Sequence, residues 1–504
     1  MEVNTVPLAS QFHGPEAAIR AGWIDPVGSE LGMVIRIAFV LSLAAAGIQA
    51  QVTQPTEDAF AAGVAEADLR RYVRELVALG PRMGGTPSND KSAAYLSAFF
   101  KKQGLDVAVL EDAPALAHWE TSWQVALADG SVIESAWPFG FSASAKVEGK
   151  LLLVPELMKA TPTAAWKGRV IYTPGDVGRA YAAIVTSGHL PAAILTSAPN
   201  DPTRYVDWSR LSSLRSSADN PVPAFSVSYV DGRALASAAQ AERTVTVSLD
   251  ATIREGRGKT VIATLKGQDP SGYYLISAHG DSDSGGPGAD DNASGVATGM
   301  EIARVYAALV LSGKVERPRY SLRFAVWGAE YHSARTFIER EGDNLKNLKG
   351  VLNFDETGTG AERDAIYFES NDVPWNETLL RALEAVGADY AGRPGFWTEY
   401  TTNPSQGGTD SYAFLPKQYK GTGQTTLQIP STTIYTAAWD KLAELDQVPG
   451  WESKGTPDPK KLKIDYSLYY HSSGDTPENT TEREPQNMVR AVKATGIALI
   501  RLNR

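Results

Sequence analysis

Apolar residues recur at helical spacing near residue 70 of the chain. Five of them fall on one face of a helix: Leu69, Tyr72, Val73, Leu76 and Leu79. This spacing predicts an amphipathic helix that ends at Gly80 and Pro81, because these residues stop a helix. A second helix is predicted over residues 92–104 and an apolar strand over 105–110. Helices that lead into a strand indicate the beginning of an α/β domain.

Residues 115–250 show a different pattern, with short apolar runs separated by Gly and Pro. The segment GKLLLVPE (149–156) is one example. The pattern predicts a strand-rich insert with a helix near residues 178–187. With 504 residues, the chain exceeds the size at which a single hydrophobic core stops growing. We therefore expect the insert to interrupt a second domain, which comprises residues 55–114 and 251–504.

Three predicted strands in the last part of the chain each lead to a residue that can carry chemistry. The strands are YYLISA (273–278), SLRFAVW (321–327) and GVLNF (350–354), and they lead to His279, Glu330 and Asp355, respectively. Between the first two strands, residues 293–309 have the apolar spacing of a helix. In open α/β sheets, ligands bind outside the carboxyl ends of the strands, so this order nominates a site.

A loop rich in Gly, Ser and Asp follows the first of these strands and reads AHGDSDSGGPGADDNASG (278–295). It sets His279 among four aspartates: Asp281, Asp283, Asp290 and Asp291. Such a composition also suits a solvated, turn-rich loop, but the position of His279 at a strand end favours a site. The chain has no cysteine, so a metal would be held by His, Asp, Glu or Tyr, a donor set that suits zinc, manganese or cobalt. Asp281 is placed to accept the second ring N–H of His279 and to orient the ring.

A second histidine occupies a similar turn near the carboxyl end of the chain. His471 lies at the start of the segment HSSGDTPEN, which has the Gly, Asp and Pro of a turn. His332 directly follows Glu330 and Tyr331 and is a further candidate. The other three histidines have no local carboxylate pattern, so structural roles are expected for His13, His118 and His189.

Composition and charge narrow the class of protein. An apolar content of 43% and a charged content of 21% are ordinary for a globular protein. A net charge of −10 argues against non-specific binding to nucleic acid, which needs a basic face to neutralise phosphates.

Residues 33–50, MVIRIAFVLSLAAAGIQA, have the basic start, apolar run and small-residue end of a secretory signal peptide. The run is short for a membrane span, and a membrane anchor is the alternative. We expect residues 1–50 to be an upstream extension and signal peptide, with Met33 as the alternative start. The mature protein is then expected to be periplasmic or extracellular, without stable membrane insertion.

Six segments together resemble the zinc-dependent exopeptidases that include bacterial leucyl aminopeptidases, glutamate carboxypeptidase and, as a relative without peptidase activity, the transferrin receptor. The segments are AHGDS (278–282), PGADDNASG (287–295), WGAE (327–330), LNFDETG (352–358), GGTDSYAF (407–414) and YHSSGDTPEN (470–479). The resemblance implies an α/β fold with a mixed, mostly parallel sheet sandwiched by helices. It also implies that the strand-rich insert is a protease-associated domain.

The resemblance gives a role to each candidate side chain. Asp291 would bridge two zinc ions, His279 and Asp355 would complete the first zinc site, and His471 would bind the second zinc. Glu330 would be the general base, which takes a proton from water and passes it to the leaving amine. Zinc would lower the pKa of its bound water to about 7 and polarise the peptide carbonyl. Tyr470, beside His471, could donate a hydrogen bond to the developing oxyanion.

At Tyr331 the chain departs from this family, which has a second glutamate there that binds one zinc. A neutral phenol is a poor zinc ligand, and its reference pKa of about 10 means that the metal has to displace its proton. Three outcomes are open: Tyr331 binds as a phenolate, His332 or Glu356 replaces it, or the site is weak. We favour a weakened second site that Asp291 and His471 hold loosely.

The expected function is that of a zinc metallopeptidase that cleaves peptides as an exopeptidase, with aminopeptidase activity expected first from its frequency in the family. A single-zinc aminoacyl transferase of the glutaminyl cyclase kind is an alternative, against which the insert argues. A catalytically inactive receptor or binding protein is another, against which the retained candidate residues argue. The expected partner is a peptide and not nucleic acid, and the sequence does not decide side-chain preference or oligomeric state.

Overall fold

The computed structural model describes residues 54–197, 208–359, 365–370, 373–404, 409–417, 423–436 and 469–504. The account below concerns the unit formed by residues 55–504. The predicted upstream extension and signal peptide lie outside the described residues.

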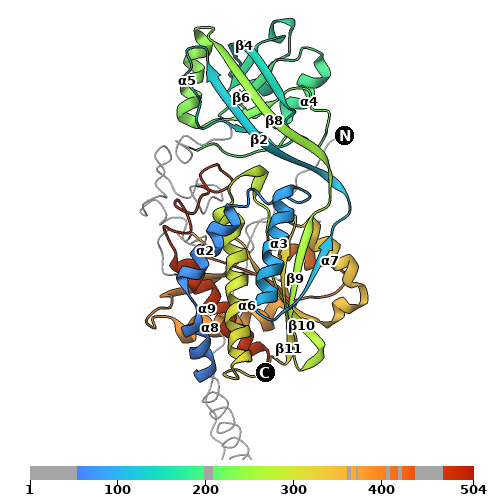
Figure 1. The fold of residues 1–504 in the computed structure, drawn as a ribbon, viewed down its shortest axis with the longest axis vertical. Coiled ribbons are helices and arrows are strands. Elements are labelled where there is room, and N and C mark those ends of the chain that lie inside the picture. Colours follow the sequence, from blue (N-terminus) through green and yellow to red (C-terminus); the bar gives the residue numbers. More distant parts are fainter. Residues whose placement is uncertain are drawn as a thin grey trace, which may run out of the picture. The chain divides into compact units, whose positions relative to one another are not determined.

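An eight-stranded sheet lies at the centre of this unit (Figure 1). Its strands, in spatial order, are β1 (Asp106–Glu111), β9 (Lys259–Leu265), β11 (Tyr320–Trp327), β10 (Asp269–His279), β12 (Leu348–Phe354), β15 (Ser431–Tyr435), β13 (Ala365–Ser370) and β14 (Glu399–Pro404). The four strands β11, β10, β12 and β15 are mutually parallel, and four of the seven neighbouring strand pairs are parallel. The mixed, mostly parallel sheet expected from the sequence is confirmed.

Helices cover both faces of this sheet, because successive side chains of a strand point to opposite faces. In β10, Tyr274 and Ile276 join one hydrophobic cluster, and Tyr273 and Leu275 join another. The first cluster includes residues of α2 (Glu66–Val77), α3 (Pro87–Lys102), α6 (Gly295–Leu311), α8 (Glu377–Tyr390) and α9 (Gln486–Leu502). The second includes residues of α7 (His332–Glu341). The sheet is therefore sandwiched by helices, as expected.

Helix α6 runs through the first of these clusters. The stretch Ala289–Leu311 that contains it is long and apolar enough to span a membrane, but its apolar window is 67% buried, as in the core helix of a folded domain. Helix α3 starts five residues earlier than its apolar pattern predicts. The Thr86 side chain accepts the Asn89 N–H and Pro87 occupies the first helical position, so polar residues extend the helix at its start.

A second sheet, of seven strands, is formed by residues between β1 and β9. Its strands, in spatial order, are β2 (Ala115–Leu127), β8 (Thr244–Gly256), β4 (Ala145–Leu153), β5 (Val170–Thr173), β6 (Ala193–Thr196), β7 (Ala224–Ser226) and β3 (Trp137–Pro138). With α4 (Gly178–Ser187) and α5 (Tyr229–Gln240), these strands enclose hydrophobic clusters of their own. The long antiparallel pair β2 and β8 joins them to β1 and β9 (Figure 1). We call this part the insert; its assignment as a protease-associated domain and the predicted domain limits stay predictions.

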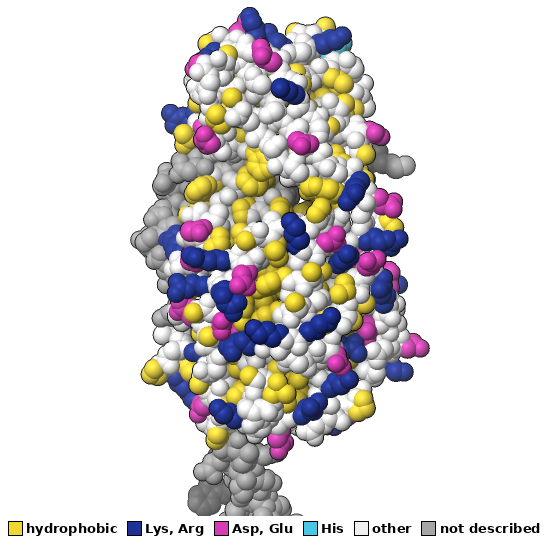
Figure 2. Space-filling view, viewed as in Figure 1, with side chains coloured by type: hydrophobic (Ala, Val, Ile, Leu, Met, Phe, Trp, Pro, Cys, Tyr) yellow, Lys and Arg dark blue, Asp and Glu magenta, His cyan; other side chains and the backbone are white. Residues whose placement is uncertain are grey.

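Charged side chains are spread over the face of the molecule that Figure 2 shows. Figure 2 shows basic and acidic side chains interspersed on one face, without separation of the two signs into large areas. Together with the net charge of −10, this face offers no counterpart for the phosphates of a nucleic acid.

Candidate metal centre

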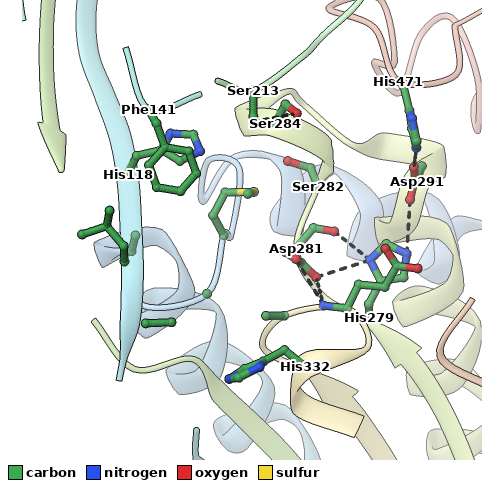
Figure 3. Close-up of a pocket in the computed structure, with 17 residues that line it drawn as sticks. His118, Phe141, Ser213, His279, Asp281, Ser282, Ser284, Asp291, His332 and His471 are labelled. Atoms are coloured by element: carbon green, nitrogen blue, oxygen red, sulfur yellow. Dashed lines mark hydrogen bonds and ion pairs between the residues drawn. The ribbon is translucent and has the colours of Figure 1, made fainter. Parts of the chain in front are cut away.

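A pocket of about 380 Å³ lies at the carboxyl ends of β10 and β11 (Figure 3). On one side it is lined by His279, Asp281, Asp291, Glu330 and His471, and on the other by His118, Phe141 and Ser213 of the insert. The strand ends that the sequence nominates therefore do face a cavity, and the insert supplies its opposite wall.

Asp291 lies between two histidines and presents one oxygen to each. Its Oδ1 is 3.3 Å from His279 Nε2, and its Oδ2 is 3.0 Å from His471 Nε2. Figure 3 shows the two imidazole rings on opposite sides of this carboxylate. Asp355 Oδ1 is 3.4 Å from the same nitrogen of His279. This arrangement suits a carboxylate that bridges two metal ions, with one imidazole for each ion.

Asp281 fixes the orientation of His279. The His279 Nδ1 atom is 3.0 Å from the main-chain oxygen of Asp281 and 3.4 Å from its carboxylate. A hydrogen bond at Nδ1 sets the tautomer in which Nε2 is the ligand atom. The Asp281 carboxylate also accepts the backbone N–H of Glu330 at 3.1 Å. Asp281 thus links the ends of β10 and β11 at the pocket.

Opposite charges are buried together around Asp291. Burial by itself raises the pKa of this carboxyl, but the two neighbouring histidines hold the pKa well below its usual range. Burial lowers the pKa of His279, while Asp355 and the hydrogen bonds to Asp281 and Asp291 outweigh burial and raise this pKa well above its usual value. In the metal-free protein the group therefore holds protons that a metal ion has to displace.

Glu330 is partly buried beside the same side chains. One carboxylate oxygen of Glu330, one of Asp355 and one ring nitrogen of His279 lie within 4.8 Å of one another. Burial raises the pKa of Glu330 well above its usual value, and the negative charges of Asp410 and Asp355 add to this effect. A carboxylate this close to the histidine and aspartate donors is within reach of a water molecule bound there.

The ring of Tyr331 packs against a small apolar cluster that consists of Val373, Tyr412 and Leu415. Its backbone N–H donates to Asp410 Oδ1 at 2.8 Å, and its φ of 48° lies in the left-handed region that few non-glycine residues adopt. Tyr331 thus has a packing role beside the pocket, and its role as a phenolate ligand stays a prediction.

The two residues considered as replacements for Tyr331 differ in their environment. Glu356 is 5% exposed, and its Oε1 has no hydrogen-bond partner among the described residues. Burial raises the pKa of Glu356 well above its usual value, and the charge of nearby Asp291 adds to this effect. His332 is exposed and lies apart from the two histidines of the centre in Figure 3. Glu356 is therefore the better placed of the two.

Tyr470, the candidate oxyanion donor, stacks on His471. The ring centroids are 3.6 Å apart and the ring planes are inclined by 24°. This contact supports the imidazole of His471, and the oxyanion role of Tyr470 stays a prediction.

Two buried aspartates support the site in ways that the sequence did not reveal. The carboxylate of Asp475 accepts the backbone N–H groups of Asp290 and Asp291, at 2.8 and 3.0 Å. Asp410 holds the backbone of Tyr331, and burial raises the pKa of Asp410 to about 7. Both aspartates lie in the segments that carry the family resemblance, which is the only sequence signal that could have found them.

Arg82 and His118 also belong to the site without a sequence signal. Arg82 is 1% exposed and donates to the main-chain oxygens of Gly280 and Gly288, both at 2.8 Å. His118, for which the sequence suggested a structural role, lines the pocket, and its Nδ1 is 3.1 Å from a carboxylate oxygen of Glu120.

The donor set fits zinc. Imidazole nitrogens and carboxylate oxygens converge on Asp291, and the chain has no thiolate to favour a softer ion. Two buried carboxylate oxygens near the centre, Glu356 Oε1 and Asp410 Oδ2, have no hydrogen-bond partner among the described residues. A buried polar oxygen without a partner is costly, and a cation bound beside these two oxygens would offset that cost.

The fold and this donor set define an α/β protein with a histidine and carboxylate metal centre at the carboxyl ends of its strands. Residues 260–496 match the profile of Peptidase family M28. Among similar proteins are a leucine aminopeptidase 2 from Arthroderma otae, 27% identical over 268 residues (51% of this chain and 48% of that protein), and a probable zinc metalloprotease from Pyrenophora tritici-repentis, 27% identical over 201 residues (32% and 44%). The chain spans about half the length of these relatives.

Solved structures share the fold. A zinc aminopeptidase from Bacillus subtilis is 18% identical with a TM-score of 0.58, and the similarity covers 87% of this chain and 95% of that one. A peptidase M28 precursor from Shewanella amazonensis is 15% identical with a TM-score of 0.61, and the similarity covers 90% and 97%. Together with the family profile and the similar leucine aminopeptidase, this shared fold confirms the expected resemblance to zinc-dependent exopeptidases.

Proposed function

We propose that the protein is a zinc metallopeptidase that cleaves peptides as an exopeptidase, and in particular as an aminopeptidase. The observation that carries this proposal is the position of Asp291, whose two oxygens face His279 and His471. The match of residues 260–496 to Peptidase family M28 and the similarity to a leucine aminopeptidase and a zinc aminopeptidase support it.

Bound zinc lowers the pKa of water and polarises the peptide carbonyl. His279, Asp291, Asp355 and His471 are the residues that would hold it. Glu330 takes the proton of the attacking water at its carboxylate and delivers it to the leaving amine, which typically contributes about 10² to 10⁴ in rate. Asp281 keeps the imidazole of His279 and the backbone of Glu330 in register for this transfer.

The pocket is closed on one side by the insert, so the substrate lies between two walls. The metal-binding side chains form one wall, and His118 and Phe141 of the insert form the other. A peptide terminus enters such a cavity end-on, which favours cleavage near the end of a peptide. We also propose that the protein is exported, on the basis of residues 33–50.

The test is metal analysis combined with a peptide screen. The purified chain should contain zinc, and a chelator should abolish hydrolysis of peptides with a free amino terminus. Asp291→Asn, which keeps the side-chain shape and removes its charge, should lose zinc, whereas Asp250→Asn on the exposed surface of the insert should keep it. Less than about a tenth of an equivalent of zinc after mild purification would contradict the proposal.

Substrate preference separates the remaining alternatives. Cleavage of peptides with a blocked amino terminus alone would refute the aminopeptidase assignment. Zinc binding without hydrolysis of any peptide would favour a transferase of the glutaminyl cyclase kind or an inactive binding protein.

A further inference from the structure

A short segment of the insert runs beside the loop that carries His471. The Leu211 N–H donates to the main-chain oxygen of His471 at 2.8 Å, and the Ser473 N–H donates to the main-chain oxygen of Ser209 at 2.8 Å. An antiparallel bridge lies between these two hydrogen bonds. Residues 209–211 and 471–473 thus pair as a small piece of antiparallel sheet.

Trp208 extends this contact to both ends of the loop. Its ring meets the ring of Tyr469 edge-on, with 6.0 Å between centroids. At Gly474, an added Cβ would come within 2.6 Å of the Trp208 ring, so the indole lies directly on the backbone there. Residues 208–211 therefore contact the loop from residue 469 to residue 474.

The loop needs such support, because it contains turns and no helix or long strand. His471 has a φ of 49°, a strained conformation for a non-glycine residue that persists only where the surroundings hold it. On the other side of the loop, Asp475 holds the backbone of Asp290 and Asp291. The loop that carries His471 (residues 469–474) is thus held on one side by the insert and on the other by the aspartate-rich loop (residues 278–295).

We propose that residues 208–211 of the insert are a positioning element that holds His471 against Asp291. The inference rests on the proposed function, in which His471 binds the second zinc. The second zinc site would then depend on the insert, and loosening residues 208–211 should weaken zinc binding there. The first site should not change, because His279 and Asp355 follow strands of the large sheet.

Zinc titration of the metal-free full chain against a competing chelator tests this coupling. Trp208→Ala should weaken the second zinc by at least about tenfold, the range in which supporting residues affect metal affinity, and should leave the first within about threefold. Trp208→Phe should restore most of the affinity, because a benzene ring still covers Gly474. The matched control is Trp123→Ala, which removes another half-buried tryptophan of the insert that contacts Trp137 and not the loop. It should leave the ratio of the two affinities unchanged.

Gly474→Ala tests the same contact from the other side. The new methyl group should push the Trp208 ring away and weaken the second zinc, and it should have no further effect in the Trp208→Ala background. If Trp208→Ala does not fold, Gly474→Ala carries the test alone. Unchanged second-site affinity in the folded variants, or equal weakening of both sites, would overturn the inference only. Absence of any zinc binding by the unmodified chain would overturn the proposed function, and this inference with it.

Discussion

Arg82 is a buried cation that connects the aspartate-rich loop (residues 278–295) to the segment that follows helix α2. Its guanidinium donates to main-chain oxygens of Gly280 and Gly288 at 2.8 Å and of Gly80 at 2.9 Å. Burial lowers the pKa of Arg82 to about 10, against the opposing effect of Asp281 and other nearby carboxylates, so the side chain stays charged at neutral pH. One side chain therefore contacts the loop at two places eight residues apart.

Replacing Arg82 by methionine keeps an unbranched apolar side chain and removes every donor. Three buried carbonyl groups, those of Leu76, Gly280 and Gly288, then lose a charged partner, at about 1–3 kcal/mol each. The partly buried carbonyl groups of Gly80 and Pro287 lose the same partner. Part of this loss is offset because a charge no longer has to be buried. We expect Arg82→Met to lower the free energy of unfolding by about 3–5 kcal/mol. The free energy of unfolding of Arg82→Lys should lie between that of the unmodified chain and that of Arg82→Met, because an ammonium group cannot reproduce the planar fork of donors.

Equilibrium unfolding in urea, followed on the metal-free chain, measures this difference. The matched control is Arg71→Met. Arg71 also makes hydrogen bonds to two partners, Asp68 and Glu75, but its side chain is 50% exposed. Its removal should cost less than about 1 kcal/mol, because exposed ion pairs contribute little. A loss below about 1 kcal/mol for Arg82→Met, or equal losses for the two variants, would refute the reasoning.

Three further predictions concern the metal centre. Glu330→Gln should keep zinc and fold while lowering kcat by about 10²–10⁴-fold, because an amide cannot accept the proton; near-normal turnover would remove Glu330 from the mechanism. Tyr331→Glu should tighten the second zinc by about tenfold or more and Glu356→Gln should loosen it; two equally tight sites, unchanged by Tyr331→Phe, would contradict this. Because the pKa values of His279 and Glu330 are raised, these groups keep their protons to higher pH in the metal-free chain than the free side chains would, and zinc has to displace them. Zinc affinity should therefore rise by about tenfold per pH unit for each displaced proton, and calorimetry that finds no proton release would speak against it.

Strand ends made much of the site predictable from the sequence. The apolar runs that lead to His279, Glu330 and Asp355 correspond to β10, β11 and β12, which are neighbours in the large sheet. Parallel neighbours bring their carboxyl ends to the same edge, so local patterns were sufficient to bring these residues together. His471 required the resemblance, because its loop has no periodic pattern of its own.

Contacts between distant parts of the chain could not be predicted in this way. Arg82 binds Gly280, which is 198 residues away, and nothing in the sequence around Arg82 indicates burial. His118 faces the pocket because of the position of β2, which is set by its pairing with β8. The sequence shows that Tyr331 stands where the family has a glutamate. Only the structure shows that the ring of Tyr331 packs beside Val373 and Leu415.

The two predicted zinc sites rest on supports of different stiffness. His279 and Asp355 follow adjacent parallel strands in the core of the large sheet, so neither can move without disturbing that core. His471 lies in a turn that is held from outside by the insert. The position at which the resemblance expects a second glutamate is Tyr331, which packs against an apolar cluster. The missing glutamate and the dependence of His471 on the insert should both lower the affinity for the second zinc. The second zinc is thus expected to bind more weakly and to respond to whatever displaces the insert, while the first stays in place.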